Sequence, residues 1–215
     1  MKSSALPYWL AFAVTLVAVY GGFKVYQAEN ARPTGGIDNV RLPRLQEFEL
    51  TDQSGQPFRS TDMKGKVWVA SFFFSTCPAS CARLNANIKY LTTLEELSDV
   101  TWVSITVDPE TDTPGVLKAY AENLNANLNR WHFCRSDDFA YIKRVAGDVL
   151  TVGGVAYKGH NDYVVVVDRN GKIAGLFNGY NTDDLKKGVA LLKKCLAEEP
   201  ADGKSADAEP AAEAT

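Results

Sequence analysis

The sequence predicts an α/β domain with a central mixed sheet flanked by helices. Apolar runs rich in β-branched and aromatic residues alternate with segments of helical periodicity, which is the pattern of βαβ units. The last two runs are separated by Arg169-Asn170-Gly171, a signal for a tight hairpin turn. With 215 residues, 46% hydrophobic and 23% charged, the chain is long enough for one domain plus appendages.

The strands are expected at the apolar runs. Val67–Phe74 is the longest and leads directly into a pair of cysteines. Two short strands around Phe48–Phe58, turning at Ser54-Gly55, are expected to form an N-terminal β-hairpin that covers one edge of the sheet. The other predicted strands are Thr101–Val107, Trp131–Phe133, Tyr163–Asp168 and Ile173–Phe177.

Helix signals follow three of these strands. A segment of helical periodicity begins at the cysteines. Thr113-Pro114, a capping residue followed by proline at the first helical position, predicts a helix that runs to about Leu128. Thr182-Asp183-Asp184 opens the last helix, whose apolar face consists of Leu185, Val189, Leu192 and Leu196.

The two ends of the chain differ from the domain between them. Residues 6–23 carry no charge over about 18 residues, near the lower limit for a membrane-spanning helix. We expect residues 1–26 to form a single transmembrane anchor; a cleaved secretory signal is the alternative, although no clean A-x-A site follows the apolar run. We assign residues 27–43 to a spacer, 44–196 to the folded domain and 197–215 to a disordered Ala-rich, acidic tail.

The charge pattern excludes some classes of function. The formal net charge is −3, and no basic stripe is present, so we expect no nucleic-acid partner. The sequence also has neither a phosphate-binding glycine loop nor a plausible serine triad. Basic residues on the two sides of residues 6–23 nearly balance, so they do not decide the orientation of the anchor.

The strongest motif is Cys77-Pro78-Ala79-Ser80-Cys81, where a strand leads into a helix. Leu84, Ile88 and Leu91 continue at helical spacing, so both thiols should begin the buried face of that helix. Residues four apart are neighbours on a helix, so the pair can hold one ion or form a disulfide. A helix N-terminus also favours thiolate over thiol. The alternative is a purely structural pair, either an inert disulfide or two thiols in the core.

The chain has two histidines. His160 lies just before a predicted strand, after Gly159, which would allow close backbone approach, and its loop is expected to approach the cysteine helix. A lone histidine on a loop is often only a surface residue, so His160 is a candidate ligand. His132, inside a short strand, is expected to pack or to face solvent.

Three carboxylates and the two remaining cysteines are expected to have structural roles. Asp108, Glu110 and Asp112 have the composition of a hard-metal or acid-base site, but turn and helix-start chemistry accounts for them better. Cys134, near a sheet edge, and Cys195, beside the last helix's apolar face, are expected to be buried small hydrophobes.

These residues resemble the Sco/SenC family over about residues 45–195. The resemblance is carried by Phe72–Cys81, by Ser104–Pro114, and by His160 followed by a strand and Asn170-Gly171. It implies a thioredoxin-like fold and copper bound by Cys77, Cys81 and His160. Where the family commonly has proline after the second cysteine and Asp before the histidine, this chain has Ala82 and Gly159.

The resemblance implies a copper chaperone rather than an enzyme. Two thiolates and an imidazole suit Cu(I), and the imidazole helps to retain Cu(II). The implied recipient is the copper-bearing subunit of cytochrome c oxidase, with a periplasmic copper donor or thiol reductant as a further partner. We expect a single-pass protein of a bacterial inner membrane whose domain faces the periplasm.

Other functions fit the same cysteines. A thiol-disulfide oxidoreductase or peroxidase-like enzyme would use Cys77 as the attacking thiolate and Cys81 as the resolving one. Thioredoxin-like reductases usually place a proline before the strand that faces the cysteine pair, and Thr151–Tyr163 has none. This favours metal binding. A copper-responsive sensor is a third possibility.

Overall fold

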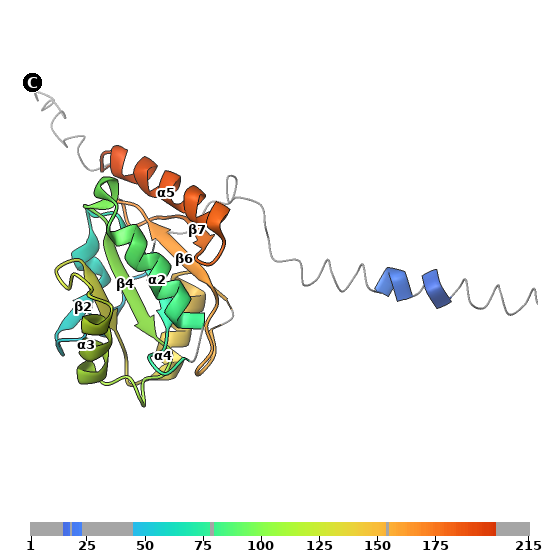
Figure 1. Cartoon of the computed structure of the whole chain (residues 1–215), viewed down its shortest axis with the longest axis horizontal. Helices are drawn as coiled ribbons and strands as arrows, with labels where there is room; N and C mark the ends of the chain where they lie inside the picture. Colours follow the sequence, from blue (N-terminus) through green and yellow to red (C-terminus); the bar gives the residue numbers. More distant parts are fainter. Residues whose placement is uncertain (1–14, 18, 23–44, 78–79, 154, 201–215) are drawn as a thin grey trace, which may run out of the picture. The chain divides into compact units, whose positions relative to one another are not determined.

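Five strands form a mixed sheet in the computed structural model (Figure 1). β3 (Trp68–Phe73) and β4 (Thr101–Thr106) are parallel, as are β4 and β5 (Trp131–Cys134). β6 (Tyr163–Val167) runs antiparallel to β3 and to β7 (Ile173–Asn178), giving the order β5-β4-β3-β6-β7. The structure describes residues 15–17, 19–22, 45–77, 80–153 and 155–200. The predicted central mixed sheet is confirmed.

β3 is buried on both faces of the sheet. Its side chains alternate between two core clusters: Trp68 and Phe72 join one, whereas Val69 and Phe73 join the other. A strand covered on both faces has few polar positions. This explains why the sequence there is a continuous apolar run.

Helices cover both faces of the sheet. The Val69 face packs against α2 (Ser80–Thr92), α3 (Pro114–Asn123) and α5 (Thr182–Ala197), and the short 3-10 helix η2 (Glu95–Leu97) lies in the same cluster. The Trp68 face packs against α4 (Phe139–Arg144), the π-helical turn η3 (Val145–Val149) and the 3-10 helix η1 (Ser60–Met63). In Figure 1, α2 crosses in front of the sheet and α4 lies behind it.

The predicted N-terminal hairpin is present and covers a sheet edge. β1 (Glu49–Thr51) and β2 (Pro57–Arg59) are antiparallel, and Gly55 turns between them with φ +75°. Thr51 and Arg135 exchange two backbone hydrogen bonds of 2.8 Å each just beyond β5, the edge strand. These bonds attach the hairpin to the edge.

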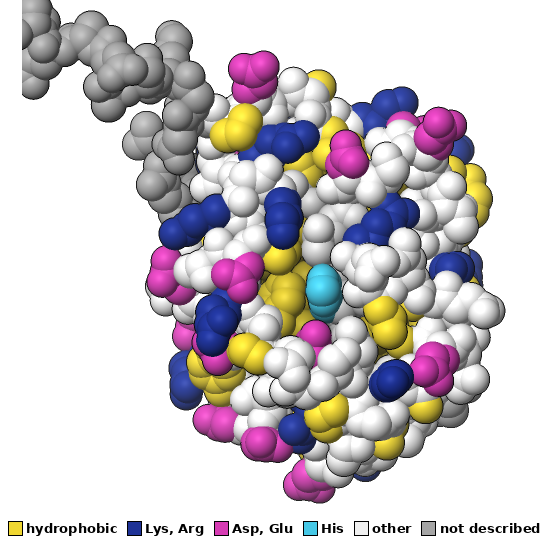
Figure 2. Space-filling model, turned by 90° about the vertical axis from the view of Figure 1, so that its left-hand side faces the viewer, with side chains coloured by type: hydrophobic (Ala, Val, Ile, Leu, Met, Phe, Trp, Pro, Cys, Tyr) yellow, Lys and Arg dark blue, Asp and Glu magenta, His cyan; other side chains and the backbone are white. Residues whose placement is uncertain are grey.

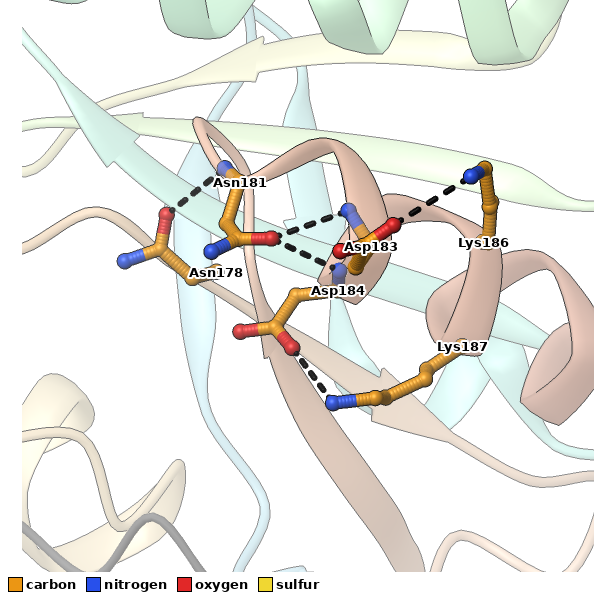
Figure 3. A network of polar contacts seen from close by, with 6 residues as sticks. All are labelled: Asn178, Asn181, Asp183, Asp184, Lys186 and Lys187. Carbon is orange, nitrogen blue, oxygen red and sulfur yellow. Dashed lines mark hydrogen bonds and ion pairs between the residues drawn. The ribbon is translucent and has the colours of Figure 1, made fainter.

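The last helix begins where the sequence predicts. The Asn181 side chain accepts hydrogen bonds from the backbone N–H groups of Asp183 and Asp184, at 2.9 and 3.1 Å (Figure 3). Lys186 and Lys187 then form ion pairs with those two aspartates. Asn181 satisfies N–H groups that the helix itself cannot.

Two helical predictions need correction. The helix that begins at Pro114 ends at Asn123, not near Leu128, because Asn125 adopts a left-handed conformation with φ +49° that a continuing helix cannot contain. α4 and η3 were not predicted, because their lengths of 6 and 5 residues are too short for a clear periodic signal.

Most of the predictions for the two chain ends concern residues that the structure does not describe. Residues 15–17 and 19–22 are helical, but most of the predicted anchor over 1–26 is not described. Within the described part of the chain, no helix is long and apolar enough to span a bilayer. The predicted spacer over 27–43 and the tail from residue 201 onward also lie outside the described residues.

Candidate metal centre

Three potential metal donors meet at the end of β3. The Sγ atoms of Cys77 and Cys81 and a ring nitrogen of His160 all lie within 4.8 Å of one another. The Cys81 Sγ to His160 Nε2 distance is 2.7 Å. The loop before β6 therefore approaches the cysteine pair, as the sequence analysis expected.

The chain geometry around Cys77 differs from the expected single helix face. The described part of α2 begins at Ser80, so Cys77 lies before it. The Cys77 backbone N–H donates to the Phe74 carbonyl at 3.3 Å, and the Cys81 N–H donates to Cys77 Sγ, also at 3.3 Å. An amide from the first turn of α2 is thus directed at the Cys77 sulfur.

The expectation that the helix N-terminus favours thiolate is wrong for Cys81. Burial raises the pKa of the Cys81 thiol to about 12, although a backbone hydrogen bond at Phe74 acts in the opposite direction. The Cys81 side chain is fully buried, so loss of solvation outweighs the helix terminus. A metal that binds Cys81 must therefore displace a thiol proton.

His160 presents its Nε2 atom to the cysteines. Its Nδ1 atom lies 2.8 Å from the Asn161 carbonyl oxygen. Because a carbonyl oxygen only accepts, Nδ1 carries the proton and Nε2 keeps a lone pair. The Cys81 thiol donates to that lone pair. The Phe74 ring packs edge-on against the imidazole, at 6.0 Å between centroids.

Gly159 does not have the role suggested for it. A Cβ added there would lie 3.6 Å from Ala156 Cβ, an ordinary van der Waals contact, so close backbone approach is not the reason for a glycine. Cys77 and His160 are half-buried. The centre is therefore accessible from the side of these two residues, while Cys81 forms its buried floor.

The acidic cluster supports the centre instead of forming another. Asp112 accepts hydrogen bonds from Ser75 and Thr106, Glu110 accepts one from Tyr157, and Asp108 pairs with Lys158. The three carboxylates thus serve separate partners, which agrees with a structural interpretation. Local sequence patterns could not identify these partners, because Tyr157 lies 47 positions from Glu110 and Lys158 lies 50 positions from Asp108.

The remaining histidine and cysteines lie outside the centre. His132 packs against the Phe58 ring at 5.4 Å, and burial lowers its pKa. Cys134 and Cys195 are buried in clusters on opposite faces of the sheet, so they do not pair with each other. In the described part of the chain, none of the four cysteines forms a disulfide.

The donor set fits a soft metal ion. Metal–sulfur and metal–nitrogen bonds are about 2.3 and 2.0 Å long, so two donors of one ion lie at most about 4.6 Å apart. The donors here need only a small adjustment to satisfy that limit. Two sulfurs and one imidazole nitrogen suit copper. The fold and the centre define an α/β protein with a Cys-Cys-His metal-binding arrangement.

Comparison with known proteins gives the family. A family model described as SCO1/SenC matches residues 40–132. An SCO2-like protein of Rickettsia felis is 31% identical over 144 residues, covering 63% of this chain and 68% of the relative. The chain belongs to the SCO1/SenC family, whose solved members share the thioredoxin-like fold.

Two solved structures of family members are similar to this chain. BsSco, described as having a disulfide switch and as a member of the Sco family of cytochrome c oxidase assembly proteins, has a TM-score of 0.61 at 25% identity, covering 73% of this chain and 96% of its own. ScoI of Bradyrhizobium japonicum, solved with copper bound, has a TM-score of 0.53 at 25% identity, covering 71% and 99%. The expected family resemblance and the thioredoxin-like fold are therefore confirmed.

Proposed function

We propose that this protein is a membrane-tethered copper chaperone that delivers copper to the CuA-type site of a cytochrome c oxidase subunit. The observation that carries the proposal is the contact between Cys81 Sγ and His160 Nε2, with Cys77 in the same group of donors. Family membership and the copper-bound relative support copper as the cargo.

The residues suit transfer better than permanent storage. Three protein donors leave a coordination position through which a ligand of the recipient can enter before the last donor leaves. On binding, copper would replace the Cys81 to His160 hydrogen bond, and the Cys81 thiol proton would be released to solvent. The half-buried Cys77 and His160 lie on the accessible side, where a recipient's ligand would attack.

The proposed setting is a bacterial inner membrane with the domain facing the periplasm. It follows from the apolar residues 6–23 and from the family resemblance. The proposed partners are the copper-bearing oxidase subunit and a periplasmic copper donor or thiol reductant. On the face seen in Figure 2, basic and acidic side chains are interspersed, so this face shows no basic stripe of the kind that binds nucleic acid.

A thiol-disulfide oxidoreductase is the second candidate. Cys77 is half-buried and Cys81 is fully buried, which would suit an attacking and a resolving thiol. The disulfide switch described for BsSco agrees with such chemistry in a relative. In that case Cys77 would attack a target disulfide, and Cys81 would then displace the reduced target and leave a Cys77–Cys81 disulfide.

A transfer experiment separates the candidates. The full-length chain, loaded with Cu(I), is mixed with a copper-free oxidase subunit, and copper is measured on each protein after separation. We expect transfer from the wild type and little copper on the His160→Ala variant. Reduction of the subunit's disulfide by the apo protein, equally fast in His160→Ala and without copper transfer from the wild type, would overturn the proposal in favour of the oxidoreductase.

A further inference from the structure

We propose that Tyr157 and Lys158 position the ligand His160 by fastening its loop to the turn at residues 107–110. The inference rests on the proposed copper site and adds two positioning residues to it. Neither side chain is a metal donor in the group that the described residues form. They act through the loop that ends in His160.

Lys158 makes two contacts with this turn. Its backbone N–H donates to the Val107 carbonyl at 3.2 Å, and its Nζ lies 3.4 Å from Asp108 Oδ2. The Asp108 side chain is fully buried, so the Lys158 ammonium supplies a counter-charge that a buried carboxylate requires. Removing the ammonium would weaken the attachment of the loop.

Tyr157 makes the neighbouring contact. Its hydroxyl donates to Glu110 Oε2 at 2.8 Å, and its ring packs edge-on against Phe139 of α4 at 5.7 Å. This hydrogen bond is exposed to solvent, so it is the weaker part of the attachment. The loop tip therefore contacts both the turn and α4.

The attachment reaches His160 through a tight turn. Ala156 and Gly159 exchange backbone hydrogen bonds of 2.8 and 2.9 Å, which places Tyr157 and Lys158 at the tip. Lys158 adopts φ +51°, a conformation that a non-glycine residue keeps only where its surroundings enforce it. Beyond His160, the Asn161 side chain donates to the Gly153 carbonyl. His160 is therefore held from both sides.

The test is a double-mutant cycle on the full-length chain with the copper ions themselves as probe. Tyr157→Phe/Lys158→Met removes the hydroxyl contact with Glu110 and the ammonium contact with Asp108. It keeps the aromatic ring, the aliphatic chain and the backbone hydrogen bond to Val107. We expect Cu(II) affinity to fall about 10-fold or more, as for other groups that orient a metal ligand. Nitrogen coupling from His160 should weaken in the Cu(II) electron paramagnetic resonance spectrum. The matched control is Tyr90→Phe/Lys118→Met, at exposed positions of α2 and α3, which should change neither.

The same double substitution in the His160→Ala background shows whether Tyr157 and Lys158 act through His160. If Tyr157 and Lys158 act through His160, the double substitution has no further effect on copper affinity in that background. An equal loss with or without His160, or wild-type nitrogen coupling in the double variant, would overturn the inference. Lys158→Arg, which keeps the charge, should retain most of the affinity. Failure of the copper site itself is distinguishable, because wild type and His160→Ala would then bind copper equally.

Discussion

Replacing Asp112 by alanine is expected to loosen the cysteine side of the centre without removing a ligand. The Asp112 carboxylate is fully buried and accepts a hydrogen bond from the Ser75 backbone N–H at 3.1 Å. It also accepts from the Ser75 and Thr106 hydroxyls. Ser75 lies two residues before Cys77, so Asp112 fixes the backbone from which Cys77 projects.

The size of the effect follows from these three donors. Each buried donor left without an acceptor costs about 1–3 kcal/mol, less where a hydroxyl can rotate toward another partner. The expected loss in the free energy of unfolding for Asp112→Ala is therefore about 3–5 kcal/mol. Asp112→Asn keeps one acceptor oxygen and should lose about half as much.

Urea unfolding of the copper-free, full-length chain measures this loss. The matched control is Asp99→Ala at an exposed position, which should change the free energy of unfolding by less than about 0.5 kcal/mol. A loss for Asp112→Ala no larger than the control's would show that Asp112 does not stabilise the Ser75 segment. Copper affinity should fall with Asp112→Ala and stay unchanged with Asp99→Ala, since only Asp112 supports the Cys77 segment.

Two further predictions concern packing and thiol reactivity. In Gly188→Ala, the added methyl would lie 2.6 Å from the Phe177 ring. Overpacking should cost about 1–3 kcal/mol, which outweighs the helix-propensity gain of about 1 kcal/mol, so the urea midpoint should fall. In the control Gly115→Ala the methyl meets open space, so the midpoint should not fall. In the native apo protein, iodoacetamide should modify the half-buried Cys77 before Cys81. Because burial raises the Cys81 pKa to about 12, its thiolate fraction and alkylation rate should rise about tenfold per pH unit from 8 to 10. Peptide mass spectrometry checks this order, and faster labelling of Cys81 at pH 8 would contradict it.

The sheet could be predicted because its signals are local. β3 reads as a continuous apolar run because both of its faces are buried. Gly55 and Gly171 adopt positive φ at the two hairpin turns, where the sequence analysis placed turns. Each of these signals depends on neighbouring residues alone.

The candidate ligands could also be found from sequence, but not the groups that support them. Cys77 and Cys81 form a recognisable motif, and His160 lies at the entry of a predicted strand. The contact of Asp112 with Ser75 spans 37 positions, and it exists only because β3 and β4 are adjacent. The pKa of Cys81 likewise depends on burial by distant segments, which outweighs the local effect of the helix terminus.

Copper stoichiometry with X-ray absorption spectroscopy shows whether Cys77, Cys81 and His160 bind one copper ion together. The reduced full-length protein is compared with its His160→Ala variant. We expect one copper per chain with two sulfur donors and one nitrogen donor in the wild type, and loss of the nitrogen in the variant. Absence of stable copper binding in the reduced wild type, or the same nitrogen signal in both proteins, would contradict it.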